Sequence, residues 1–152
     1  MAFSGIFILI PIAVPNLIWV LLSDRSPRPE VQTRINKLRG LASIEAVGRV
    51  AVMVVPVFLT IHIESRMDEA GLAVAGVALS IYYAGWIRYF LGKRVGGLLF
   101  RNLGFIPVPL ACSPVLYFLA ISVLARSIVF GVITALFGFA HIYLCLKRSS
   151  SA

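Results

Sequence analysis

The sequence predicts an all-α, polytopic integral membrane protein, a single membrane domain over residues 1–152 built as a five-transmembrane-helix bundle. The first observation is composition: 60% of the residues are hydrophobic and 13% are charged, whereas soluble domains are about half apolar and about a quarter charged. The second observation is that the sequence contains five apolar runs, each about as long as the roughly 20 residues that a helix needs to cross a bilayer. These runs lack the alternation of barrel strands, and lipid cannot satisfy an open strand edge.

The expected transmembrane helices cover residues 2–22, 41–63, 70–91, 105–125 and 127–146. The first run is interpreted as a retained helix and not as a signal peptide, because no basic residue precedes it and it exceeds an ordinary apolar signal region. Pro11 and Pro15 predict a kink there, since each removes the backbone donor for the carbonyl four residues earlier. Asn16 follows this break and could hydrogen-bond within it or to a neighbouring helix.

Only Arg126 and Ser127 separate the last two runs. A single long helix would bury Arg126, at about 2.5–3.5 kcal/mol on insertion scales. The sequence therefore favours a tight helical hairpin, with Ser127 as the N-cap of the last helix.

The net charge of +8 comes from basic residues between the apolar runs, where they act as topology signals. Eleven of them fall on one side of the five-span model and two on the other. This predicts an external N-terminus and a cytoplasmic C-terminus in a bacterial cytoplasmic membrane. Residues 30–40 and 95–104 are expected to lie at the cytoplasmic interface, near anionic lipids that attract each basic residue by about 1 kcal/mol. Nucleic acid is not an expected partner.

Two charged residues, Glu45 and Arg49, interrupt the second apolar run. They share a helical face, with the acid first, which is the favourable order. At a rise of 1.5 Å per residue, Glu45 is about 6 Å and Arg49 about 12 Å inside the run. Charged residues in membranes normally face a bundle interior or a wet cavity and mark function. We interpret the pair as one wall of a cavity open to the cytoplasm; the alternative is a self-neutralising pair whose Arg49 reaches toward the headgroups.

Most other polar and aromatic residues of the runs gather in the same, cytoplasmic half of the expected bundle. The last run also carries a stripe of Gly131, Thr134, Gly138 and His141, which predicts close helix packing and points His141 inward. The expected ligand-binding residues are Glu45, Arg49, Tyr82, Trp86, Asn16 and His141. In this site Arg49 would hold a carboxylate or phosphate, Glu45 would orient Arg49, and Trp86 would stack on a planar or amphiphilic ligand.

Common enzyme, metal and nucleotide motifs are missing from the sequence, so we expect no catalytic residues, no metal and no cofactor. Three functions are compatible with the pattern. The first is binding or transport of a small amphiphilic or anionic ligand. The second is a non-catalytic subunit or scaffold, in a homo- or hetero-oligomer. An intramembrane enzyme using Glu45 or His141 as a base ranks last.

Overall fold

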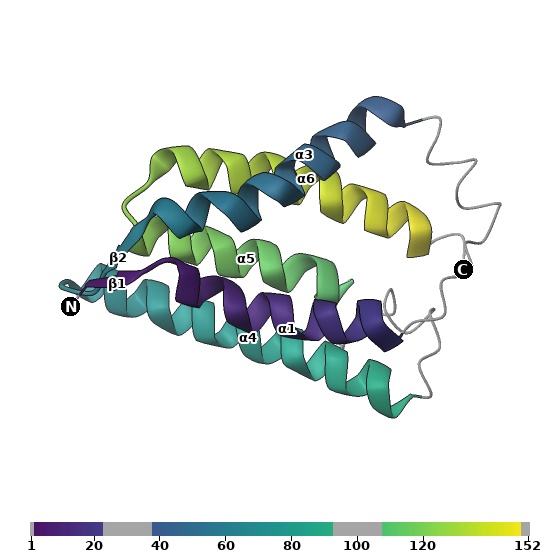
Figure 1. Cartoon of the computed structure of the whole chain (residues 1–152), viewed down its shortest axis with the longest axis horizontal. Coiled ribbons are helices and arrows are strands. Elements are labelled where there is room, and N and C mark those ends of the chain that lie inside the picture. The colour runs from purple at the N-terminus through teal and green to yellow at the C-terminus, as the bar shows by residue number, and fades with distance from the viewer. Residues whose placement is uncertain (1, 23–37, 93–107, 150–152) are drawn as a thin grey trace.

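A computed structural model describes residues 2–22, 38–92 and 108–149 (Figure 1). The described chain is almost entirely helical, as predicted, with two very short strands. Its elements are β1 (Ala2–Ser4), α1 (Ile6–Leu22), α3 (Arg39–Val54), the 3₁₀ helix η1 (Val55–Phe58), β2 (Thr60–His62), α4 (Arg66–Leu91), α5 (Pro109–Leu124) and α6 (Ile128–Ser149). The helices alternate in direction, so that α1 starts and α6 ends at opposite ends of the bundle (Figure 1).

The helices pack in a spatial order that differs from their order in the chain. α3 packs against α6, α6 against α5, and α5 against α4, while α1 lies along α4. α1 also meets η1, which continues from the end of α3. Figure 1 shows α1 and α3 diverging from this meeting point toward the other end of the bundle.

Two expected helix boundaries are wrong at the end where α1 begins. Residues 2–4 were expected to be helical and instead form β1, and the helix expected over residues 41–63 gives way to η1 and β2 after Val54. β1 and β2 pair antiparallel, with Phe3 opposite Ile61. Pro56 explains the break, because it cannot donate the backbone hydrogen bond that would continue α3. Gly5 allows the close crossing, since a Cβ there would overlap the Pro56 carbonyl.

α4 begins earlier than expected because its first turn is capped. The Ser65 hydroxyl accepts a hydrogen bond from the Asp68 N–H at 3.2 Å, and the Asp68 carboxylate accepts one from the Ser65 N–H at 3.0 Å. This reciprocal capping box satisfies two backbone donors at the helix start. Arg126 lies 3.4 Å from both Asp68 and Glu64 and so links this turn to the α5–α6 connection.

The hairpin between α5 and α6 confirms the prediction made from residues 126–127. α5 ends at Leu124, Arg126 has a left-handed φ of 51°, and α6 starts at Ile128. The Ser127 hydroxyl accepts a hydrogen bond from the Phe130 N–H at 3.2 Å, which is the expected N-cap.

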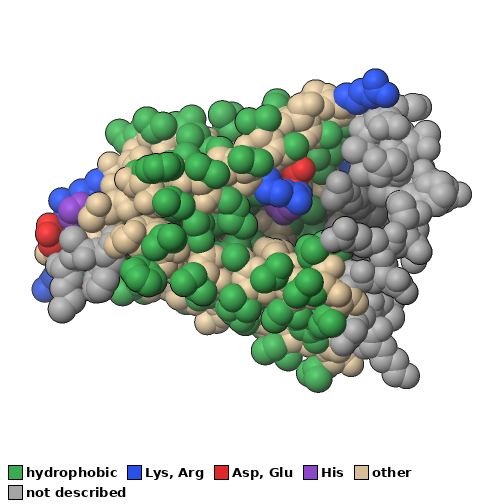
Figure 2. Space-filling model, viewed as in Figure 1, with side chains coloured by type: hydrophobic (Ala, Val, Ile, Leu, Met, Phe, Trp, Pro, Cys, Tyr) green, Lys and Arg blue, Asp and Glu red, His purple; other side chains and the backbone are tan. Residues whose placement is uncertain are grey.

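The described surface is that of a membrane protein. Hydrophobic side chains are spread over the described part of the face seen in Figure 2, and many large ones are exposed. Within the described ranges, three stretches are long and apolar enough to cross a membrane, namely Arg39–Phe58, Arg66–Leu91 and Ile128–Lys147. α1 and α5 are apolar but shorter, with 17 and 16 residues. The expected interfacial segment 95–104 and residues 30–37 of the other lie outside the described residues, whereas Arg39 and Gly40 open α3.

Glycines bring α6 close to its two neighbours. A Cβ on Gly48 of α3 would lie 2.8 Å from the Cβ of Phe137 on α6, and a Cβ on Gly138 of α6 would overlap Val115 on α5. Such small residues let membrane helices approach closely. The α3–α6 contact places the charged residues of α3 beside the second half of α6.

Candidate functional site

Tyrosines from two neighbouring helices hydrogen-bond to backbone carbonyls of α1. Tyr83 donates to the Pro11 carbonyl at 3.0 Å, and Pro15 cannot supply the usual backbone donor to that oxygen. Tyr82 donates to the Ile12 carbonyl at 3.2 Å, and Tyr117 of α5 donates to the Ile8 carbonyl at 2.9 Å. The proline-containing helix is thus held by side-chain donors from α4 and α5.

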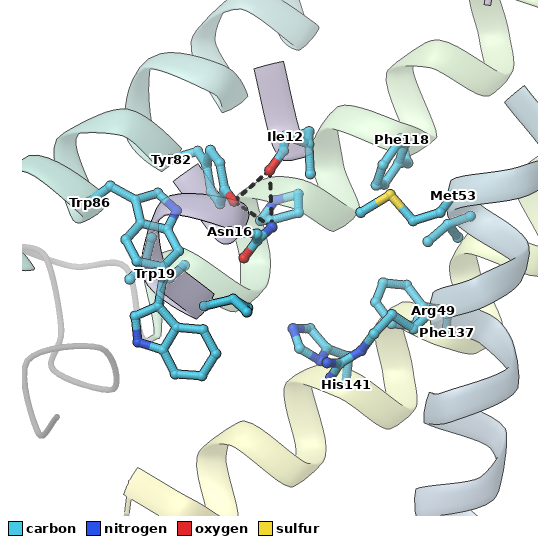
Figure 3. Close-up of a pocket in the computed structure, with 14 residues that line it drawn as sticks. Ile12, Asn16, Trp19, Arg49, Met53, Tyr82, Trp86, Phe118, Phe137 and His141 are labelled. Carbon is cyan, nitrogen blue, oxygen red and sulfur yellow. Dashed lines mark hydrogen bonds between the residues drawn. The ribbon is translucent and has the colours of Figure 1, made fainter. Parts of the chain in front are cut away.

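Asn16 joins this network from the next turn of α1. Its Nδ2 donates to the Ile12 carbonyl at 3.0 Å and to the Tyr82 hydroxyl at 2.9 Å. Both hydrogen bonds that the sequence suggested for Asn16 therefore occur together, one within its own helix and one to the neighbouring helix α4. Figure 3 shows its amide oxygen turned away from these two bonds.

The charged residues form a three-member cluster between α3 and α6. The Arg49 guanidinium pairs with the Glu45 carboxylate one turn earlier on α3. The same carboxylate oxygen lies 3.0 Å from Nδ1 of His141 on α6. The imidazole also stacks on Phe137, with ring centroids 5.0 Å apart and an interplanar angle of 17°. Two partners and a stacked ring therefore hold Glu45 and His141 in fixed orientations.

Exposure differs sharply within this cluster. The Glu45 side chain is 10% exposed, the His141 side chain 18% and the Arg49 side chain 54%. Glu45 is accordingly the buried member of the pair, and about half of the Arg49 side chain is exposed at the surface of the described bundle. Glu45 and Arg49 in α3, and His141 in α6, lie away from the ends of their helices. Figure 2 shows a group of basic, acidic and histidine side chains on the side of the described surface, with hydrophobic side chains around it.

A cavity of about 270 Å³ lies beside this cluster and is lined by all five helices (Figure 3). The lining is mainly apolar and aromatic, with polar groups from four of the helices. The lining residues are Ile12, Asn16, Trp19, Val20, Arg49, Val52, Met53, Tyr82, Trp86, Leu110, Pro114, Phe118, Phe137 and His141. A mostly apolar cavity with a few convergent polar groups is the usual form of a small-molecule site.

The structure brings the six candidate residues together. Asn16, Arg49, Tyr82, Trp86 and His141 line the cavity. Glu45 does not line it but contacts two residues that do.

Trp86 forms part of a packed aromatic wall and is not a free stacking platform. It is 5% exposed. Its ring lies edge-on to Tyr82 and Tyr89, at centroid distances of 6.1 and 5.7 Å, and it stacks on Phe90 at 5.6 Å. Its indole N–H is buried and forms no hydrogen bond of normal geometry within the described chain, although the Tyr82 hydroxyl is nearby.

Several lining residues were not among the sequence candidates. Trp19 lies three residues after Asn16, one turn along α1, and this spacing could have placed it in the same wall. Met53, Phe118 and Phe137 carry no such signal, because apolar residues on a membrane helix are equally compatible with lipid contact.

Among the described residues, no three His, Cys, Asp or Glu side chains gather closely enough to hold a metal ion. The chemistry available at the cavity is one guanidinium, one imidazole, one amide, one phenol hydroxyl and an aromatic surface. Comparisons with models of protein families, with curated proteins and with solved structures give no match to this chain.

Proposed function

We propose that this chain is a five-span membrane protein that binds, and in a transport cycle would carry, a small amphiphilic anion in the cavity beside Arg49. The observation that carries this proposal is that polar and aromatic side chains from different helices converge on one cavity. A half-exposed arginine, an imidazole and an aromatic wall come from different helices and meet at one cavity. Ionisable residues inside a membrane bundle normally mark such sites.

Five spans require α1 and α5 to cross the bilayer as well as the three longer helices. At 1.5 Å per residue, helices of 17 and 16 residues are about 24–26 Å long, against a hydrocarbon core of about 30 Å. A mismatch of this size costs fractions of a kcal/mol per Å and is commonly met by local thinning of the bilayer. The alternating helix directions support this arrangement, and the excess of basic residues favours an external N-terminus and a cytoplasmic C-terminus.

Arg49 is suited to hold the anionic group. A guanidinium has five N–H donors in a planar fork, which match a carboxylate or phosphate. Glu45 orients one side of the fork, while the half-exposed remainder is open to a ligand at the cavity. His141 adds a second polar contact, and the aromatic residues of α4 enclose the apolar part of the molecule.

Calorimetric titration of the protein in phosphatidylcholine nanodiscs tests this proposal, with naphthalene-2-carboxylate as the probe and naphthalene-2-methanol as its neutral counterpart. We expect the carboxylate to bind and the alcohol to bind much more weakly. Arg49→Gln should weaken carboxylate binding about tenfold, which equals the roughly 1.4 kcal/mol expected from one charge-assisted hydrogen bond. Arg39→Gln, at the exposed start of α3 and outside the cavity lining, is the matched control and should bind as the unmodified protein does. Equal binding of both probes would refute the proposal.

A second candidate function, a helix-packing scaffold, is favoured by the tight glycine contacts of α6 and by the internal hydrogen bonds of the polar residues. In that case the same variants would change the stability of the protein, and neither naphthalene probe would bind. The titration therefore separates the two functions.

A further inference from the structure

In the described part of the chain, the segments of α1 and α3 are joined at one end of the bundle. There, α1 meets η1 and β1 pairs with β2. Away from that end the two helices diverge (Figure 1), and each lines the cavity from its own side. Val20 of α1 and Met53 of α3 are two of these lining residues. Among the described residues, the cavity thus lies behind a lateral gap in the helix ring.

The polar group at this gap lies partway along the helices and not at their ends. Arg49 is the eleventh residue of α3, which spans Arg39–Val54, and more than half of its side chain is exposed. The neighbouring Val47 and Val50 of the same helix are exposed hydrophobic residues. A cation in this position faces the part of the bundle that lipid chains would contact.

The size of the cavity limits what can lie inside it. At roughly 30 Å³ for each water-sized group, 270 Å³ holds about nine such groups. This is enough for an anionic head and a short stretch of chain, but a long acyl chain would have to leave the cavity. The lateral gap offers such a chain an apolar path, because Val20 lines the cavity on the α1 side and is exposed, and Met53 lines it on the α3 side.

From this geometry we infer that the natural ligand is a single-chain anionic amphiphile that enters from the bilayer between α1 and α3. Its carboxylate or phosphate head pairs with Arg49 inside the cavity, and its chain extends between the two helices into the lipid. This inference rests on the proposed binding function and adds the class of ligand and its direction of approach.

Tryptophan fluorescence gives a direct test, because the only two tryptophans of the chain, Trp19 and Trp86, both line the cavity. The probes are 5-doxylstearate and 16-doxylstearate in phosphatidylcholine nanodiscs, whose nitroxide quencher lies near the head or near the chain end. We expect saturable quenching, stronger for the 5-doxyl probe. Doxyl-labelled phosphatidylcholine, which has two chains and no net negative charge, measures quenching from the surrounding bilayer and should not saturate.

Two variants connect the quenching to the inferred site. Arg49→Gln should weaken stearate binding about tenfold, through loss of a charge-assisted hydrogen bond. A second variant, Val20→Phe combined with Met53→Phe, narrows the path between α1 and α3 and should also weaken stearate binding. Phenylalanine is used because an added tryptophan would change the fluorescence that is measured. Val14→Phe is the matched control on an exposed position of α1 that does not line the cavity.

The outcomes separate this inference from the proposed function. If naphthalene-2-carboxylate binds through Arg49 while neither stearate probe shows saturable quenching, the lateral approach is wrong and the binding function stands. Equal quenching by both stearate probes, unchanged in Arg49→Gln, means simple partition into the bilayer and also overturns the inference. If neither the naphthalene probe nor stearate binds, both proposals fail.

Discussion

Oε1 of Glu45 lies 3.0 Å from Nδ1 of His141, which joins the middle of α3 to the second half of α6. The same oxygen also pairs with Arg49. A carboxylate in this position needs both partners, because a buried charge without compensation costs several kcal/mol. The cluster therefore ties the orientation of the arginine at the cavity to the packing of two helices.

The first prediction concerns the coupling of this pair. Arg49→Met should lower the free energy of unfolding by about 1–3 kcal/mol, less than for a fully buried pair because Arg49 is half-exposed and His141 still contacts Glu45. Glu45→Leu combined with Arg49→Met should recover part of that loss, since no carboxylate is then left unpaired. Thermal unfolding in detergent measures both effects. Strictly additive changes would mean that the two side chains do not interact.

Much of this cluster could be predicted from the sequence, because helix geometry places residues four apart on one face. The Glu45–Arg49 spacing therefore predicted their pairing, and the stripe ending at His141 predicted that this residue faces the bundle. The sequence did not show that His141 meets the same oxygen as Arg49. That contact depends on how α3 and α6 pack, across 96 residues of chain.

Other parts of the fold carried no sequence signal. β1 and β2 are three residues long, too short for a periodic pattern, and their pairing depends on the close crossing at Gly5. The carbonyls that lose their donors in α1 were predictable from its prolines. The identity of Tyr83 as the replacement donor was not, because an aromatic residue in this position also suits the membrane interface.

A second prediction follows from the contact between Tyr83 and Pro11. Tyr83→Phe should cost about 1 kcal/mol, because the Pro11 carbonyl loses its side-chain donor. In a Pro15→Ala background the same change should cost much less, since the new backbone N–H at position 15 can bond to that carbonyl. A double-mutant cycle of unfolding free energies tests this. The same cost in both backgrounds would show that the tyrosine does not compensate for the proline.

The third prediction concerns the contact between α5 and α6. Gly138→Ala should lower stability by about 1–3 kcal/mol, because the added methyl group overlaps Val115 and overpacks the helix contact. Val115→Ala should restore much of that stability when the two changes are combined. Gly76→Ala on α4 is the matched control, since nothing lies within 4 Å of its added methyl group. The control should be neutral or stabilising by up to about 1 kcal/mol, from helix propensity. A similar loss in both glycine variants would contradict the packing contact.

The fourth prediction is the orientation of the bundle in the membrane. Met67 is 72% exposed in the first turn of α4, and Ser149 ends α6 at the opposite end of the bundle. The excess of basic residues near the end of α6 predicts that this end is cytoplasmic. In a background carrying Cys112→Ser and Cys145→Ala, Met67→Cys should react with a membrane-impermeant maleimide in intact cells. Ser149→Cys should react only after the cells are permeabilised.

Labelling after permeabilisation is the control that both introduced thiols are reactive. If both react from outside intact cells, the bundle crosses the membrane an even number of times between the two positions, and the five-span arrangement fails. If only Ser149→Cys reacts in intact cells, the span number stands and the orientation is reversed. The cavity beside Arg49 lies nearer the ends of α1 and α4 than their starts, so a reversed orientation would place the anion site in the outer half of the membrane. The labelling result therefore decides from which leaflet a single-chain amphiphile would reach Arg49.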